Sequence, residues 1–232
     1  MGADADTVVL DEVEVLLDGP WATPKVRAAL RSGSYERAER GILTATLSPD
    51  DSYLELGCGI GVLATLAATR VGGESVVAID ADPSISTVAR DTASRNGHAI
   101  DVRNAVLLRE LAGTTVDFYV RPDFRLSSLD PSPTRKEAET RVADMQKVSV
   151  PVVDPYETIA DVNASYLMVD IEGGELDLLS QPLPESVRTI CVELHLEATE
   201  VGARSEMFAA VMDAGFELDF RRSDPPVLLF TR

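Results

Sequence analysis

The sequence contains little cysteine and no long apolar run. Its 232 residues include two cysteines, Cys58 and Cys191, which are too few for a disulfide framework. No apolar run approaches the roughly 20 residues that cross a bilayer, and the chain does not open with the basic and then apolar segments of a signal peptide. We therefore expect a reduced, cytoplasmic protein that does not associate with a membrane.

Basic residues are scarce as well. The chain has 21 Lys and Arg against 39 Asp and Glu, which gives a formal net charge of -18 at pH 7. A surface of this sign repels nucleic-acid phosphates and anionic lipids, so we expect neither a nucleic acid nor a membrane as partner. A homo-oligomer is left open by the composition.

One stretch near the middle organises the chain. Hydrophobic residues make up 45% of the sequence, which is enough for one core and favours one domain overall. The apolar, β-prone run Tyr53–Leu56 leads directly into three glycines, Gly57, Gly59 and Gly61, and a helical pattern begins at Val62. A strand, a glycine turn and a helix form a nucleotide-binding βα unit, because glycines allow both the sharp turn and the close approach of a ligand.

After residue 52 the expected strands and helices alternate, which is typical of a doubly wound, mostly parallel α/β sheet. The last two strands, at residues 216–220 and 227–231, are joined by a short turn and must be antiparallel. The prediction is a seven-stranded sheet with an antiparallel C-terminal hairpin, in a main domain of residues 51–232. Residues 121–147 are polar and contain three prolines, and form either a lid insertion or a loose surface excursion.

Residues 1–50 are expected to form an N-terminal helical cap, with helices over residues 24–31 and 34–47. Tyr35 and Glu36, at the start of the second helix, could reach a ligand. The preferred interpretation is that Glu36 is a solvated acid stabilised by the helix dipole.

The spacing of the glycines decides between two cofactors. A dinucleotide site needs Gly-x-Gly-x-x-Gly, but Val62 stands where the third glycine belongs. Glu55 with Gly57, Gly59 and Gly61 gives Glu-x-Gly-x-Gly-x-Gly instead. This motif, together with the terminal hairpin, resembles the class I S-adenosylmethionine-dependent methyltransferases, whose sheet carries an antiparallel seventh strand. The resemblance implies a Rossmann-like fold and S-adenosyl-L-methionine as the cofactor.

Two further residues are candidates for binding this cofactor. Asp80 ends the second strand, where a carboxylate can accept hydrogen bonds from both ribose hydroxyls. The alternative for Asp80 is a helix N-cap, a role that Asp82 fits better. Asn104 follows the third strand and could contact the adenine amino group, and a loop amide that bonds its own backbone is the open alternative.

Two later segments carry a narrower resemblance. Residues 169–176, VDIEGGEL, are similar to the Asp-hydrophobic-Glu-Gly-x-Glu segment of the FkbM family of methyltransferases, and residues 192–195, VELH, resemble that family's fifth strand. Glu55 stands where family members commonly have Asp, a change that keeps the charge. The resemblance implies O-methylation of a small-molecule or sugar hydroxyl, and therefore a small-molecule or carbohydrate substrate.

Chemistry is expected beyond the carboxyl ends of the strands, where open parallel sheets bind ligands. His195 is the candidate general base, because histidine titrates near neutral pH, and a structural imidazole is the alternative. Asp170 and Glu172 could hold the acceptor, assist His195 or ligate a hard cation. These acids with Glu193 form an incomplete magnesium site, so no metal ligand is predicted.

Two other functions stay open. The chain could be an NAD-type Rossmann oxidoreductase, against which Val62 counts, or a non-catalytic protein that binds S-adenosylmethionine as a partner or sensor. The basic residues Arg121, Arg125, Arg135 and Lys136 could meet an anionic acceptor, although pairing with nearby acids is the preferred interpretation.

Overall fold

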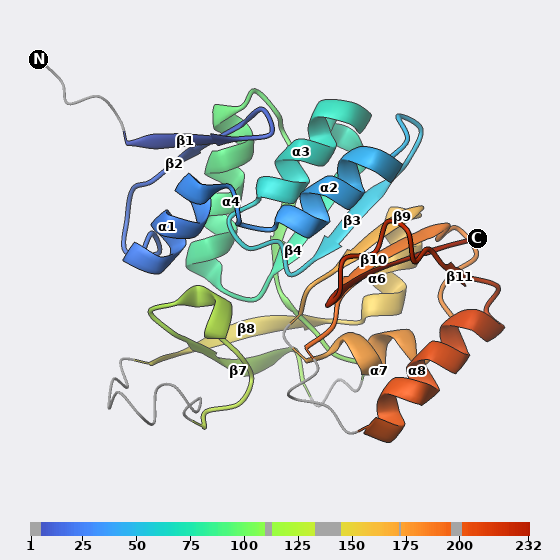
Figure 1. Cartoon of the computed structure of the whole chain (residues 1–232). Helices are drawn as coiled ribbons and strands as arrows, with labels where there is room; N and C mark the ends of the chain where they lie inside the picture. Colours follow the sequence, from blue (N-terminus) through green and yellow to red (C-terminus); the bar gives the residue numbers. More distant parts are fainter. Residues whose placement is uncertain (1–5, 110–112, 133–144, 172, 196–200) are drawn as a thin grey trace, which may run out of the picture.

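The structure, a computed structural model, describes residues 6–109, 113–132, 145–171, 173–195 and 201–232. Its centre is a seven-stranded sheet in the order β11-β12-β10-β9-β3-β4-β5 (Figure 1). The strands from β10 to β5 are parallel, whereas β12 is antiparallel to both β10 and β11. The predicted fold class is thereby confirmed. The strand bounds are β3 Tyr53–Leu56, β4 Val76–Asp80, β5 Asp101–Asn104, β9 Tyr166–Val169, β10 Thr189–Glu193, β11 Glu217–Leu218 and β12 Val227–Thr231.

Helices cover both faces of this sheet (Figure 1). Successive residues of a strand point to opposite faces, so Leu54 and Leu56 join one buried cluster while Tyr53 joins another. The cluster around Tyr53 includes residues of α2, α3 and α4, and the cluster around Leu54 includes residues of α6, α7 and α8. The helix bounds are α2 Arg37–Thr46, α3 Val62–Val71, α4 Pro83–Arg95, α6 Pro155–Val162, α7 Glu175–Leu179 and α8 Val201–Asp213.

The N-terminal segment differs from the expected helical cap. Helix α1, Pro24–Ser32, begins after the N-cap Thr23 and ends at Gly33 as predicted, but an antiparallel strand pair, β1 Thr7–Leu10 and β2 Val13–Leu16, precedes it. Alternate residues of β2 are fully buried, which is the period of a strand with one face in a core. This segment packs on the start of α3 and α4, and so closes the sheet edge next to the glycine turn.

A second, three-stranded sheet stands beside the first, in the order β6-β8-β7. Its strands are β6 Val106–Leu107, β7 Thr115–Val120 and β8 Gln146–Val153. The polar excursion leaves the end of β7 and includes the short 3-10 helix η2, Phe124–Leu126. Of the expected lid insertion, residues 133–144 lie outside the described residues.

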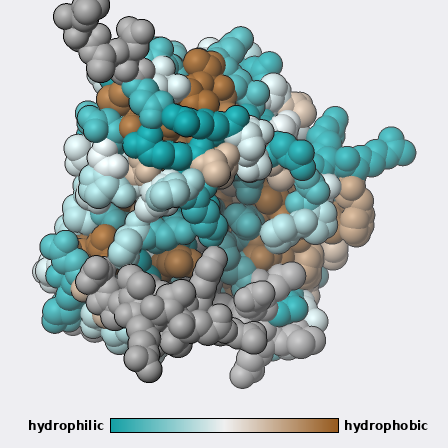
Figure 2. All heavy atoms as spheres, turned by 60° about the vertical axis from the view of Figure 1, so that its left-hand side comes forward, coloured by the Kyte–Doolittle hydropathy of each residue, from teal (hydrophilic) through white to brown (hydrophobic). Residues whose placement is uncertain are grey.

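The surface agrees with the composition. The face shown in Figure 2 is mainly hydrophilic, and its hydrophobic areas are small and separate. Within the described ranges, no helix has both the length and the apolar character that crossing a membrane requires.

Candidate functional site

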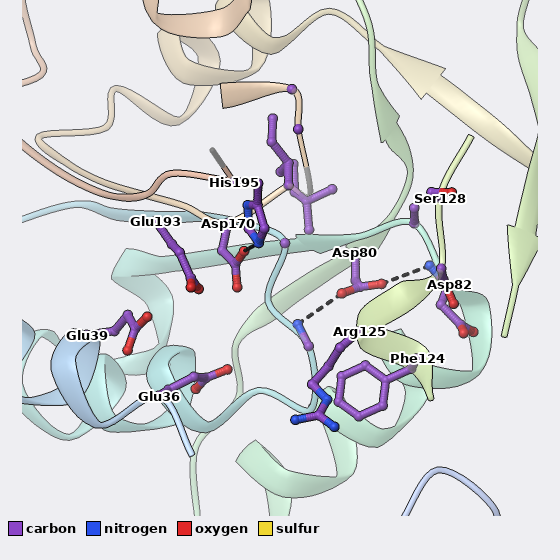
Figure 3. A pocket seen from close by; sticks show the side chains of 18 of the residues that line it. Glu36, Glu39, Asp80, Asp82, Phe124, Arg125, Ser128, Asp170, Glu193 and His195 are labelled. Atoms are coloured by element: carbon purple, nitrogen blue, oxygen red, sulfur yellow. Dashed lines mark hydrogen bonds and ion pairs between the residues drawn. The ribbon is translucent and has the colours of Figure 1, made fainter. Parts of the chain in front are cut away.

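A cavity of about 1050 Å³ opens at the carboxyl ends of the parallel strands (Figure 3). Its walls come from the glycine turn after β3, the ends of β4, β9 and β10, the segment that leads into α2, and the excursion after β7. These elements are distant in sequence and meet only because the strand ends share one edge of the sheet. This is the edge at which the sequence predicted ligand binding.

The three glycines of the turn have different roles, although all have positive φ angles. A Cβ on Gly57 would lie 1.7 Å from the carbonyl oxygen of Asp170, and one on Gly61 would lie 2.8 Å from the Cα of Ala89. Gly57 therefore lets the turn pass β9, and Gly61 lets α4 approach α3. Only at Gly59 would a Cβ have mainly side chains as neighbours, the nearest being the Tyr35 hydroxyl at 3.1 Å. Gly57 and Gly59 line the cavity, whereas Gly61 supports it from behind.

Asp80 holds the glycine turn against the end of β4. Its Oδ2 accepts a hydrogen bond from the Gly59 N–H at 2.9 Å, and its Oδ1 accepts one from the Asp82 N–H at 2.8 Å (Figure 3). Burial raises the pKa of Asp80 to about 7, against the opposing effect of these two hydrogen bonds. Each oxygen can still accept a second hydrogen bond, so the carboxyl group is suited to a pair of ligand hydroxyls.

Asp82 has the N-cap role that the sequence predicted. Its Oδ1 accepts hydrogen bonds from the N–H groups of Ser84 and Ile85 at the start of α4. Its Oδ2 is buried at the cavity and has no hydrogen-bond partner among the described residues. That oxygen is a second acceptor beside Asp80.

Glu55 and Asn104 are not among the residues that line the cavity. Glu55 points into the core below the turn, where it is 1% exposed and accepts a hydrogen bond from the Tyr53 hydroxyl. Burial raises its pKa well above the usual value. Asn104 donates to the carbonyl oxygens of Asp80 and Ala81, so the alternative of a loop amide bonded to backbone describes it. Both residues shape the site without facing it.

The opposite wall carries the candidate general base. His195 follows β10, and its Nδ1 lies 2.8 Å from Oε1 of Glu175, the first residue of α7. Its Nε2 lies 3.7 Å from Oδ1 of Asp170, at the end of β9. The structure therefore brings together His195 and Asp170 as predicted, while Glu172 lies outside the described residues. Asp170, Glu193 and His195 also offer ligand atoms within 4.8 Å of one another, which is a separation that a metal ion could bridge.

Glu175 is a functional residue that the sequence did not reveal. At the start of a helix it was explained by the helix dipole, yet its side chain is 1% exposed and also accepts the N–H of Gly173. Although burial opposes ionisation, the hydrogen bonds from His195 and Gly173 lower the pKa of Glu175. A buried, ionised acid fixes which imidazole nitrogen carries a proton, and leaves Nε2 directed toward the cavity.

Acidic side chains gather at the same end of the cavity. Glu36, Glu39 and Glu193 face it together with Asp170 (Figure 3). The pKa of Glu39 is raised, first by burial and further by the neighbouring Glu193. The interpretation of Glu36 as a solvated acid was wrong, because burial and the nearby acids raise its pKa well above the usual value.

The described basic residues of the excursion are held by the protein itself. Arg121 is buried and donates to the carbonyl oxygens of Asp130 and Ser132, and Arg125 forms an ion pair with Asp123. This agrees with the preferred interpretation for these two residues. Arg135 and Lys136 lie outside the described residues.

The cavity fits the predicted cofactor from one end to the other. Beside Asp80, the residues after β5 give an apolar wall of Ala105, Val106 and Leu107. On the other side of Asp80, toward β9, the wall becomes acidic. S-adenosylmethionine has a flat apolar base, a ribose diol and a cationic amino acid end in that order, so apolar, hydrogen-bonding and anionic surfaces follow its parts.

A model of the family described as ribosomal protein L11 methyltransferase (PrmA) matches residues 41–120. Among curated proteins, the ribosomal protein L11 methyltransferase of Symbiobacterium thermophilum is 45% identical over 65 residues, 28% of this chain and 21% of that protein. The protein of the same name from Thermotoga maritima is 37% identical over 68 residues, 29% of this chain and 25% of that protein. The aligned segments thus span about a quarter or less of these relatives.

Solved structures of methyltransferases are similar as well. A ribosomal protein L11 methylase from Lactobacillus delbrueckii subsp. bulgaricus has 18% identity and a TM-score of 0.47, over 86% of this chain and 79% of that one. Trm1 from Pyrococcus horikoshii, in complex with S-adenosyl-L-methionine, has 10% identity and a TM-score of 0.49, over 97% of this chain and 60% of that one.

These comparisons agree with the predicted class of enzyme and its cofactor, and they correct two predictions. The assignment to the FkbM family was wrong, since the family model that matches is another one. The expected small-molecule or carbohydrate substrate is contradicted too, because the relatives are named for a protein substrate. The FkbM-like segments are short and lie at strand ends, where acids before a turn recur for structural reasons alone.

Proposed function

We propose that this protein is an S-adenosylmethionine-dependent methyltransferase that methylates amino groups of a protein, with a ribosomal protein of the L11 kind as the acceptor. The observation that carries the proposal is the family match over residues 41–120, because that segment contains the glycine turn and Asp80. The residues expected to meet the acceptor lie outside it. The acceptor is therefore inferred from the names of the relatives together with the acidic end of the cavity.

On the cofactor side, the proposed roles follow from the hydrogen bonds already formed. Asp80 accepts the ribose hydroxyls while it keeps the N–H of Gly59 in place. Asp82 Oδ2 is a further acceptor at the same wall. The bound cofactor supplies a methyl group on a sulfonium, and the protein's contribution is to orient the acceptor in line with that group.

On the acceptor side, the acidic wall suits an amine. A lysine ammonium is protonated at neutral pH and is attracted by carboxylates such as Asp170 and Glu193. The amine must lose a proton before its lone pair can attack a methyl group. We assign that proton to His195 Nε2, which faces the cavity while Glu175 holds Nδ1.

The charge of the whole chain supports a basic partner. A net charge of -18 steers cationic proteins toward the enzyme and disfavours anionic ones. Ribosomal proteins are made in the cytoplasm, so we also place the reaction there.

A transfer assay tests the proposed function. Purified protein is incubated with methyl-labelled S-adenosylmethionine and unmethylated ribosomal proteins of the same organism, which are then separated on a gel. We expect label in a protein of the size of L11, and loss of label with His195→Asn. Cofactor binding without label in any ribosomal protein would overturn the proposed acceptor, and the absence of cofactor binding would overturn the proposal as a whole.

A further inference from the structure

Glu36 has a backbone and a side chain that its place in the fold does not explain. It precedes α2 with φ 46° and ψ 36°, in the left-handed region that non-glycine residues rarely adopt. A glutamate at this position usually contributes to the helix end, yet the side chain of Glu36 makes no capping hydrogen bond. It points into the cavity instead (Figure 3).

The carboxylate of Glu36 is incompletely satisfied there. The Tyr35 hydroxyl is hydrogen bonded to it, but Oε2 is buried and has no hydrogen-bond partner among the described residues. Oε1 lies 3.8 Å from the point that a Cβ on Gly59 would occupy. The other groups that act on this carboxyl are the acids Glu39, Glu55 and Asp170. A cluster of buried acids with a vacant acceptor is unfavourable unless a cation is bound.

The order of the strands indicates which cation this is. The apolar wall after β5 takes the base and Asp80 at the end of β4 takes the ribose, so the rest of the cofactor extends toward β3 and β9. Glu36 lies on that side. Two positive groups of the cofactor can reach it, the sulfonium and the α-ammonium, and only the ammonium donates hydrogen bonds.

We propose that Glu36 binds the α-ammonium of the amino acid end of S-adenosylmethionine. This role belongs to Glu36 because Glu55, the acid of the glycine motif, lies in the core and does not line the cavity. The inference rests on the proposed function as far as the cofactor is concerned, and it does not depend on the acceptor. An ammonium donates to Oε2 with a charge-assisted hydrogen bond and offsets the neighbouring acids.

Calorimetry with three ligands tests the assignment. S-adenosylmethionine has the ammonium and the sulfonium, S-adenosylhomocysteine has the ammonium alone, and 5′-methylthioadenosine has neither. Glu36→Gln keeps the size of the side chain and removes its charge. We expect it to raise the Kd of the first two ligands by roughly 10- to 100-fold and that of methylthioadenosine by less than about twofold. The exposed Glu157→Gln on α6 is the matched control and is expected to leave all three unchanged.

Each other pattern overturns the assignment. An equal loss for all three ligands would make Glu36 structural, and a loss for S-adenosylmethionine alone would place it at the sulfonium. A second measurement needs no variant: wild-type protein is expected to bind deaminated S-adenosylhomocysteine more weakly than the parent compound, and equal affinity would contradict the role of Glu36. If wild-type protein binds none of these ligands, the proposed function fails with it. Binding of the cofactor with an unaffected Glu36→Gln variant removes only this inference.

Discussion

At the scale of single residues, the site depends on acids whose neighbours change their behaviour. Sequence position alone explained Glu36 and Glu175 as first-turn acids of helices, because the helix dipole favours such residues. The fold gives them other surroundings: Glu175 contacts His195, and Glu36 faces a cavity. Neither contact could be predicted, since each joins segments whose relative placement depends on the whole sheet.

The pair of Glu175 and His195 makes the first prediction. Glu175→Gln keeps the size of the side chain but no longer requires a proton on Nδ1, so the imidazole loses its fixed orientation. We expect kcat to fall by roughly 10-fold or more while the Kd of the cofactor stays unchanged. Steady-state kinetics and calorimetry measure the two quantities. An unchanged kcat in a variant that melts like wild type would show that Glu175 does not position the base.

Asp80 makes a prediction about pH and stability. In the unfolded chain it ionises near pH 3.8, whereas burial raises its pKa in the folded protein to about 7. Between these values the unfolded state binds fewer protons than the folded state, so rising pH lowers the free energy of unfolding. The limit is about 1.4 kcal/mol per pKa unit, reduced by solvent screening because Asp80 is only half-buried.

Denaturant unfolding of wild type and Asp80→Asn from pH 4 to pH 8 measures this effect. Wild type is expected to lose stability relative to the variant up to about pH 7 and to follow it in parallel above. The exposed Asp213→Asn on α8 is the control. A constant difference between wild type and Asp80→Asn across the window would contradict the raised pKa.

At the scale of elements, the turn after β3 shows how much of a site a motif can predict. The spacing of its glycines indicated the strand, the turn and the helix, and all three are where they were expected. The individual roles were not predictable. Gly57 is required by the approach of β9 and Gly61 by the approach of α4, and both partners come from later in the sequence.

This division of roles can be measured with alanine. At Gly57 a Cβ would overlap the carbonyl oxygen of Asp170, and we expect Gly57→Ala to lower the free energy of unfolding by roughly 3 kcal/mol or more. Gly97 has a similar φ of 81° but nothing within 4 Å of its Cβ position, so Gly97→Ala is expected to cost only about 1–2 kcal/mol. Equal losses would show that the left-handed backbone alone, and not the contact with β9, requires glycine at position 57.

At the scale of the whole molecule, the alternation of strands and helices and the C-terminal hairpin predicted the sheet correctly. The N-terminal strand pair was missed because β1 and β2 are each four residues long and resemble parts of an irregular segment. The family and the substrate were assigned wrongly, since short acidic segments at strand ends carried more weight than the negative charge of the chain. That charge, together with the acidic wall at the end of β9 and β10, favours a cationic acceptor.

The central claim is that this enzyme transfers a methyl group to nitrogen in a protein. The most direct measurement is tandem mass spectrometry of unmethylated ribosomal protein L11 after incubation with the purified enzyme and S-adenosylmethionine. The account predicts methyl groups on lysine side chains or on the terminal amine, and none when Asp80→Asn replaces wild type. Methyl groups on oxygen, or an L11 that gains none while the enzyme binds its cofactor, would contradict it.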